Sequence, residues 1–218
     1  MARRELRILV LAGCVLPSIT LVLLLAFPPG ALAWGKAGHR VVATLAMGLL
    51  TPDARNQVAL LLGPNVTLAE IATWADEVRP SRPYTRPWHY VNLPRDATAY
   101  NATRDCARGC VVSAIEQSLR LLQDKSKDRA VRQEALKWVV HLLADLHQPL
   151  HAIADDRGGN DVILQFNGRL TNLHRLWDGD IIDRAYPGQR MLQDQVLAKL
   201  QTVNSRAWQG GLPQDWAE

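Results

Sequence analysis

The sequence carries little net charge, which limits how it could bind a polyanion. It has 25 Lys and Arg against 21 Asp and Glu, a formal net charge of +4. Three of the arginines and one glutamate lie in the first 33 residues, so the remainder has 22 basic against 20 acidic residues, or +2. Binding over a broad surface requires a strongly basic face. We therefore expect any contact with nucleic acid to be confined to a local site.

Cysteine is also scarce, with three residues in the whole chain. Cys14 lies in an apolar stretch near the N-terminus, whereas Cys106 and Cys110 lie four apart in a loop that contains Gly and Arg. An even pair of cysteines in an exported chain predicts one local disulfide. A zinc knuckle is the alternative, but it needs two more ligands, and Asp105 is the only candidate nearby.

Repeats, low-complexity tracts and most strand patterns are missing as well. The run VILQF at 162–166, followed by Asn167-Gly168, is the one clear strand and hairpin turn. The Pro-rich stretch at 80–87 predicts a loop, which is followed by a short extended piece at 88–93. Polar loops are predicted at 94–110 and 155–161. Helical patterns cover 38–50, 52–62, 67–78, 111–123, 128–146, a segment starting at 171, and 191–208. We expect an all-α domain with a small β-hairpin.

The first 33 residues have the three parts of a secretory signal peptide. Arg3, Arg4 and Arg7 are followed by an apolar run from Ile8 to Phe27 and by Ala31-Leu32-Ala33. We predict cleavage between Ala33 and Trp34, a mature domain of residues 34–218, and a secreted or periplasmic location. The apolar run is nearly long enough to cross a bilayer, so an uncleaved anchor is the alternative.

The segment HLLADLHQPLH, residues 141–151, is the most informative stretch. His141 and Asp145 lie four apart, on one face of a helix, and Pro149 should end that helix. A buried imidazole and carboxylate need partners, and a transition metal suits this pair. The alternative is a core helix with polar caps.

Further candidate ligands are spread along the chain. Asp76 is expected near the C-terminal end of helix 67–78, where the helix dipole disfavours a carboxylate. The ligands include no cysteine, which favours catalytic over structural zinc, and imidazoles disfavour calcium and magnesium. Their number suits three metals that share one carboxylate. The full set is the free amine and carbonyl of Trp34, His39, Asp76, His89, His141, Asp145, His151, His174 and Asp178.

Six motifs together resemble the zinc-dependent single-strand nuclease and 3'-nucleotidase family of fungi, plants and bacteria, which shares its fold with bacterial zinc phospholipase C. Their order and spacing match the family from Trp34 to Asp178. The motifs are WGKAGH (34–39), ATWADEVR (72–79), WHYVN (88–92), HLLADLHQPLH (141–151), GGND (158–161) and TNLHRLWD (171–178).

The resemblance implies a role for each ligand. One zinc would be held by Asp76, His89, His141 and Asp145; a second by Trp34, His39 and the shared Asp145; a third by His151, His174 and Asp178. Arg79 would face charge that builds on the phosphoryl oxygens. Its alternative role is a surface pair with Glu77. His147 is no ligand in this scheme.

The resemblance also implies a base pocket formed by Tyr90 and the segment with Gly159, Asn160 and Val162. Fungal members have an acid at the position of Asn92, so base preference does not carry over. The family continues with further helices beyond Glu218, so we expect C-terminal helices to be missing from this chain.

The implied function is a secreted enzyme with three Zn²⁺ ions that hydrolyses single-stranded DNA and RNA to 5'-phosphate products. 3'-Mononucleotides are further expected substrates, and no stable protein partner is implied. A zinc phospholipase C is the rival enzyme; Arg79, the Gly-Gly-Asn turn and Asp178 argue against it. A periplasmic zinc-binding protein that stores metal is the non-enzymatic alternative.

Overall fold

The structure, a computed structural model, describes residues 34–204 and 210–218. The predicted signal peptide, residues 1–33, lies outside the described residues. No helix within 34–204 and 210–218 combines the length and apolar composition that crossing a membrane requires.

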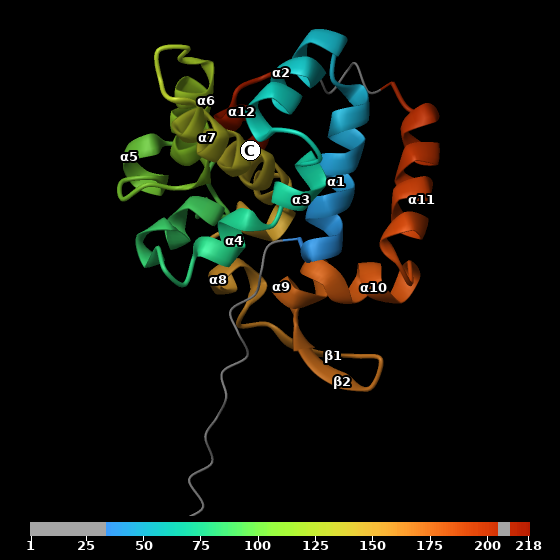
Figure 1. Ribbon diagram of the computed structural model, residues 1–218. Helices are drawn as coiled ribbons and strands as arrows, with labels where there is room; N and C mark the ends of the chain where they lie inside the picture. The colour runs from blue at the N-terminus through green and yellow to red at the C-terminus, as the bar shows by residue number, and fades with distance from the viewer. Residues whose placement is uncertain (1–33, 205–209) are drawn as a thin grey trace, which may run out of the picture. The chain divides into compact units, whose positions relative to one another are not determined.

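The described residues are mostly helical, with one two-stranded hairpin, which confirms the predicted all-α class (Figure 1). The α-helices are α1 (Lys36–Leu49), α2 (Pro52–Leu62), α3 (Leu68–Ile71), α4 (Trp74–Val78), α5 (Ala102–Asp105), α6 (Val111–Gln123), α7 (Arg129–Leu146), α8 (Asp156–Gly159), α9 (Leu173–Arg175), α10 (Ile181–Ala185), α11 (Gln189–Gln201) and α12 (Pro213–Ala217). Two 3-10 helices, η1 (Pro83–His89) and η2 (Pro149–His151), and a π-helix, η3 (Leu176–Asp180), join them.

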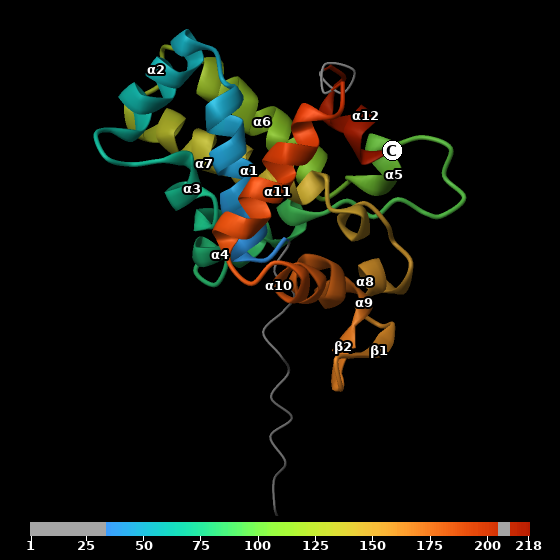
Figure 2. The same ribbon diagram turned by 90° about the vertical axis from the view of Figure 1, so that its right-hand side faces the viewer.

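Helix α7 lies at the centre of the helical packing. It runs beside α6 and also contacts α1, α2, α3, α4 and α12. Figures 1 and 2 show α6 and α7 side by side, with α1 and α11 forming a second neighbouring pair. A helix surrounded in this way can bury polar side chains as well as apolar ones.

Two apolar clusters flank α7. Trp138, Leu142 and Leu146 of α7 join a cluster built around Val91 and α6. Leu136 joins a second cluster with residues of α1, α2 and α3. Burying one large apolar side chain contributes about 1.5–3 kcal/mol to folding. His141 and Asp145 lie on the same helix among these residues, so the clusters fix the part of α7 from which both project.

The hairpin follows α8 and projects away from the helices (Figures 1 and 2). Strand β1 (Ile163–Phe166) pairs antiparallel with β2 (Arg169–Asn172), and Phe166 lies opposite Arg169. Asn167 and Gly168 have φ angles of 49° and 75°, as a two-residue hairpin turn requires. The predicted hairpin is confirmed.

Several predicted helix boundaries are also confirmed. Helix α6 covers the predicted 111–123, and α7 begins one residue after the predicted start, with Asp128 as its N-cap. Thr51 caps α2 by accepting a hydrogen bond from the Ala54 N–H (3.2 Å).

The single helix predicted at 67–78 is wrong. The chain forms α3 and α4, separated at Ala72 and Thr73. At this break the Ala72 carbonyl accepts a hydrogen bond from the His141 ring (2.7 Å), which no local pattern could indicate. Asp76 consequently lies in the first turn of α4, where the helix dipole favours a carboxylate. Thr67 and Glu70 form a capping box at the start of α3.

The irregular segments contain more helix than predicted. Residues 83–89 form η1, so the extended piece starts only at Tyr90, not at Trp88. A proline at the first position favours the start of such a turn. Short helices α5 and α8 interrupt the predicted loops. The helix predicted from 171 begins only at 173, after β2. The helix predicted at 191–208 is α11, which begins at Gln189 and ends at Gln201; residues 205–208 of the predicted range lie outside the described residues.

Cys106 and Cys110 form the predicted disulfide, with a Cα–Cα distance of 5.1 Å. This bond removes both thiolates, so the zinc-knuckle alternative is wrong.

Candidate metal centre

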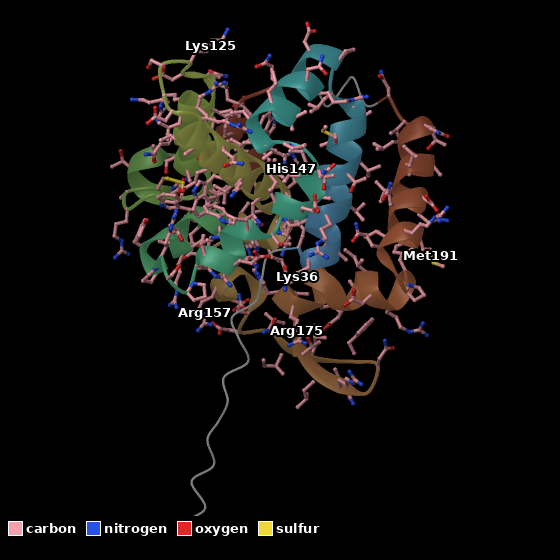
Figure 3. All side chains as sticks on the ribbon, in the orientation of Figure 1. Lys36, Lys125, His147, Arg157, Arg175 and Met191 are labelled. Carbon is pink, nitrogen blue, oxygen red and sulfur yellow. A yellow bond between two sulfur atoms is a disulfide. The ribbon has the colours of Figure 1, made fainter. Side chains whose placement is uncertain are left out.

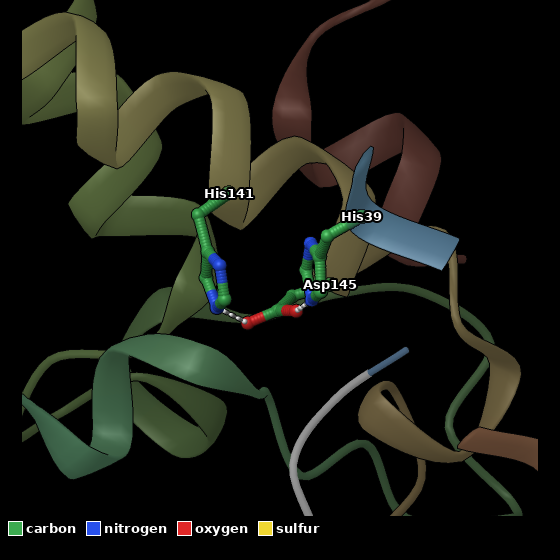
Figure 4. Close-up of side chains that lie close together, drawn as sticks. All are labelled: His39, His141 and Asp145. Atoms are coloured by element: carbon green, nitrogen blue, oxygen red, sulfur yellow. Dashed lines mark ion pairs between the residues drawn. The ribbon is translucent and has the colours of Figure 1, made fainter. Parts of the chain in front are cut away.

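Asp145 of α7 is the meeting point of three imidazoles. His39 from α1 places Nε2 3.2 Å from Asp145 Oδ1, whereas His89 Nδ1 and His141 Nε2 lie 2.9 Å and 3.2 Å from Oδ2. Figure 4 shows one oxygen of the Asp145 carboxylate facing the His39 ring and the other facing the His141 ring. The two oxygens of one carboxylate thus face different sets of ligands, and all four side chains are buried.

Asp76 and Arg79 of the α4 segment border this cluster. Asp76 Oδ1 lies 3.9 Å from both His89 Nδ1 and His141 Nε2. The guanidinium of Arg79 lies 3.5 Å from the same oxygen. Glu77 instead accepts a hydrogen bond from the Thr73 hydroxyl (2.7 Å). Arg79 therefore belongs to the edge of the cluster, and its pairing with Glu77 is not observed.

A second buried group consists of His151 from η2, His174 from α9 and Asp178 from η3. The rings of His151 and His174 stack with centroids 5.0 Å apart. His174 Nε2 lies 3.4 Å from Asp178 Oδ2, which realises the expected i, i+4 spacing. These residues come from separate short elements, so only the folded chain assembles them.

Backbone carbonyls hold three of the imidazoles in one orientation. The Nδ1 atoms of His141, His151 and His174 each lie 2.7 Å from a carbonyl oxygen, of Ala72, His89 and Gly158 respectively. A carbonyl accepts a hydrogen bond, so each Nδ1 carries a proton, and Nε2 is the ring atom that can donate a lone pair when the imidazole is neutral. This arrangement is typical of imidazoles that bind metals.

Gly35, the residue after Trp34, is held beside the second group. The Gly35 N–H donates to the Asp178 carbonyl oxygen (2.6 Å). Gly38 lies under the Trp34 side chain, since a Cβ atom there would be 3.1 Å from Trp34 Cβ. Coordination by the Trp34 amine and carbonyl stays a prediction.

The charges of the cluster shift its pKa values in opposite directions. Burial alone lowers the pKa of His141, but the carboxylates of Asp145 and Asp76 outweigh burial and raise it to about 9. Burial opposes ionisation of Asp145 too, yet His141 and the neighbouring imidazoles hold its pKa well below the usual range. The two carboxylates therefore strongly favour positive charge beside them.

In the second group burial dominates. It lowers the pKa of His151 to about 4 and also lowers that of His174. It raises the pKa of Asp178 to about 8. Both imidazoles are consequently neutral at pH 7, the state in which they can donate a lone pair to a metal.

Six buried polar atoms of the described side chains have no hydrogen-bond partner, and all belong to the predicted ligands. They are His39 Nδ1 and Nε2, Asp76 Oδ1, His89 Nε2, Asp145 Oδ1 and Asp178 Oδ2. An unpaired buried polar group costs about 1–3 kcal/mol.

A metal ion would give several of these atoms a partner. Three sets of side chains have ligand atoms within 4.8 Å of one another: His39, His141, Asp145; Asp76, His89, His141; and His151, His174, Asp178. Their nitrogen and oxygen donors fit a transition metal.

The residues of the predicted base pocket lie close in sequence to ligand residues of both groups. Tyr90 follows His89 and is 39% exposed. Asn92 is exposed, Gly159 packs against the Leu173 side chain, and Asn160 and Val162 are partly buried. Their contact with a base stays a prediction. His147, labelled in Figure 3, is exposed.

Gln148 is the residue that the sequence reading missed. It is fully buried, and its amide donates to Asp178 Oδ1 (2.6 Å). A polar residue between the ligands Asp145 and His151 was the available signal, but its partner lies 30 positions away.

Comparisons with known proteins give a consistent result. A family model described as S1/P1 Nuclease matches residues 34–218. Nuclease S1 of Aspergillus oryzae is 32% identical over 177 residues, which covers 78% of this chain and 61% of that protein. Endonuclease 2 of Arabidopsis thaliana is 36% identical over 185 residues, which covers 78% of this chain and 63% of that protein. For nuclease P1 of Penicillium citrinum the identity is 32% over 179 residues, covering 78% and 66%. The chain thus spans about three fifths of the length of the first relatives it matches.

Proposed function

The chain belongs to the S1/P1 nuclease family, and we propose that it is a zinc-dependent hydrolase that cuts phosphodiester bonds in single-stranded DNA and RNA. Its products would carry 5'-phosphates, and 3'-mononucleotides would be further substrates. The observation that carries this proposal is the buried His/Asp constellation around Asp145, in which the unpaired atoms all belong to metal-ligand types.

Three zinc ions would occupy the centre. Asp76, His89, His141 and Asp145 would hold one; His39, Asp145 and the amine and carbonyl of Trp34 would hold a second. The third would be held by His151, His174 and Asp178. Zinc ions in such a site supply Lewis acidity, neutralise phosphoryl charge and lower the pKa of bound water.

The protein's own residues would orient and complement the phosphate. Asp145 would be a ligand shared by two metal ions, because one of its oxygens faces His39 and the other faces His89 and His141. Arg79, fixed 3.5 Å from Asp76, would present a permanent positive charge to the phosphoryl oxygens. Tyr90, exposed beside His89, would offer a ring for base stacking.

We also propose that residues 34–218 act as the nuclease domain and that residues 1–33 direct export before removal at Ala33–Trp34. The Cys106–Cys110 disulfide supports an oxidising compartment outside the cytoplasm.

The test uses chain 34–218 with an authentic Trp34 terminus, purified and analysed for metal. We expect about three zinc ions per chain and cleavage of denatured DNA and RNA much faster than of duplex DNA. Chelator should abolish cleavage, and zinc should restore it.

Phosphatidylcholine serves as the competing substrate. Hydrolysis of the lipid without cleavage of nucleic acid would contradict the proposal in favour of a phospholipase C. A chain that binds zinc but hydrolyses neither substrate would instead be a metal-storage protein.

A further inference from the structure

Gln148 is fully buried although its side chain is polar. It lies between the end of α7 and η2, so it separates Asp145 from His151 along the chain. A buried amide that lacks partners costs about 1–3 kcal/mol, so its contacts determine how it is oriented.

The two ends of the Gln148 side chain have different partners. Its Oε1 accepts a hydrogen bond from the Leu150 N–H (2.5 Å), and its Nε2 donates to Asp178 Oδ1 (2.6 Å). A backbone N–H is only a donor, so it fixes the amide with oxygen toward Leu150. The NH₂ group must then face the carboxylate.

This contact distinguishes the two oxygens of Asp178. Oδ1 is occupied by Gln148, whereas Oδ2 has no hydrogen-bond partner and lies 3.4 Å from His174 Nε2. Without the amide, the carboxylate could rotate about its Cβ–Cγ bond, and neither oxygen would be held toward His174. One oxygen is therefore reserved for the group formed with His151 and His174.

The backbone of Gln148 forms hydrogen bonds to both neighbouring ligands along the chain, Asp145 and His151. Its N–H donates to the Asp145 carbonyl oxygen (3.0 Å), and its carbonyl accepts from the His151 N–H (2.9 Å). Pro149, directly after it, fixes the chain further. The backbone from which the Gln148 side chain projects is therefore fixed at both ends.

We propose that Gln148 is a positioning residue, which holds the Asp178 carboxylate so that Oδ2 faces a metal ion bound with His151 and His174. This inference rests on the proposed function, because it assumes that this group holds a metal. Hydrogen-bond partners of metal ligands typically account for a 10–100-fold difference in metal affinity.

The experiment compares Gln148→Met with His147→Gln in chain 34–218 loaded with zinc. Met keeps the length and bulk of Gln but cannot donate, whereas His147 is the exposed neighbour and bonds only within its own helix end, to the Leu143 carbonyl. Zinc per chain is measured after dialysis against increasing chelator, and circular dichroism monitors helix content.

We expect Gln148→Met to lose one zinc about 10–100-fold more readily than the wild type, with the other zinc ions retained. His147→Gln should follow the wild type. Should Gln148→Met lose its helical signal, Gln148→Glu replaces it: Glu keeps the acceptor for Leu150 but sets two carboxylates against each other, so it should lose the same zinc at least as readily.

A second measurement asks whether Gln148 acts through Asp178. In an Asp178→Asn background, Gln148→Met should change zinc retention little, because the carboxylate it positions is gone. Fully additive losses, equal loss from all sites, or unchanged retention in Gln148→Met would each overturn the positioning role. A wild-type chain that binds no metal would overturn the proposed function as well, so the two failures are distinguishable.

Discussion

Asp145 receives more contacts from candidate ligands than any other carboxylate described above, which makes it the most sensitive single position. Asp145→Asn keeps the size of the side chain but removes the charge that both ligand sets share. We expect loss of bound zinc and a fall in activity on single-stranded DNA of more than about 10³-fold, on the order of several kcal/mol. Metal analysis and cleavage rates measure both effects.

The matched control for this substitution is Asp194→Asn, which removes a carboxylate from the exposed face of α11. It should behave as the wild type. If Asp145→Asn retained most of its zinc and activity, Asp145 would not be the shared ligand.

A substitution at Arg79 tests whether its positive charge contributes to catalysis independently of the metal ions. Arg79→Gln removes the guanidinium near Asp76 but leaves every proposed ligand in place. We expect kcat to fall about 10²–10³-fold with zinc content unchanged, as for the loss of one transition-state donor. Steady-state kinetics on a dinucleotide, together with metal analysis, provide the measurement.

Arg82→Gln is the comparison for Arg79. Arg82, three residues after Arg79, forms a half-exposed ion pair with Glu134 of α7 (2.6 Å). Its loss should cost at most about 1 kcal/mol of stability and leave kcat unaltered. Equal effects of both substitutions on kcat would show that Arg79 has no specific role.

Asp178 makes zinc binding at its group dependent on pH. Burial raises its pKa to about 8, so the metal-free side chain is mainly protonated at pH 7, and zinc must displace that proton. Affinity should therefore rise with pH, about tenfold per unit below pH 8, and level off above it. His151, with a pKa of about 4, adds no competing proton in this range.

The measurement is a competition titration of metal-free protein between pH 6 and 9. Asp178→Asn should remove most of the pH dependence for the site formed with His151 and His174 while lowering its affinity. A pH-independent affinity in the wild type would mean that the carboxylate is already ionised before zinc binds.

The short elements of the centre owe their shape to contacts that are distant in sequence. Helices α6 and α7 and the hairpin were predictable because apolar spacing and turn residues act locally. The break between α3 and α4 was not, because the carbonyl at that break accepts a bond from His141, 69 positions away. Gln148 was missed for the same reason, since its buried partner lies on η3.

At the scale of one element, Gly158 of α8 is expected to be irreplaceable. Its φ is +67°, and a Cβ atom would lie 2.5 Å from the Leu150 carbonyl oxygen, while its own carbonyl holds the His174 ring. Gly158→Ala should destabilise the fold by more than about 1 kcal/mol and weaken one zinc site. Thermal unfolding and zinc retention test this.

Gly168→Ala is the control that separates the cost of backbone strain from the cost of steric contact. It also has a positive φ, +75°, but a Cβ atom there would meet nothing within 4 Å. Gly168→Ala should show only the modest cost of a left-handed residue and leave zinc binding unaltered. Equal effects of Gly158→Ala and Gly168→Ala on stability and zinc retention would show that the steric contact with the Leu150 carbonyl has no effect of its own.

For the whole molecule, the sequence was sufficient to predict the fold class and the residues that come together, because six motifs act as one pattern. It was insufficient to predict which side chains orient them. Orientation depends on the backbone carbonyl groups of Ala72, His89 and Gly158; every residue has such a group, so residue type does not reveal which carbonyl accepts the hydrogen bond.

Metal removal should therefore destabilise the chain as a whole. The ligands come from α1, α4, η1, α7, η2, α9 and η3, so zinc would connect most of the elements around the centre. A ligand present at about 1,000 times its Kd stabilises the folded state by about 4 kcal/mol. For a domain of this size, 1 kcal/mol shifts Tm by roughly 2–4 °C.

Excess chelator should accordingly lower Tm by roughly 8–16 °C per tightly bound zinc ion. Calorimetry of chain 34–218 with and without chelator measures the shift, and readdition of zinc should reverse it. Asp145→Asn, which has already lost the shared ligand, should respond much less to chelator. A wild-type Tm that chelator leaves unchanged, with zinc verified as removed, would mean that the apolar clusters on either side of α7 hold the centre together without metal.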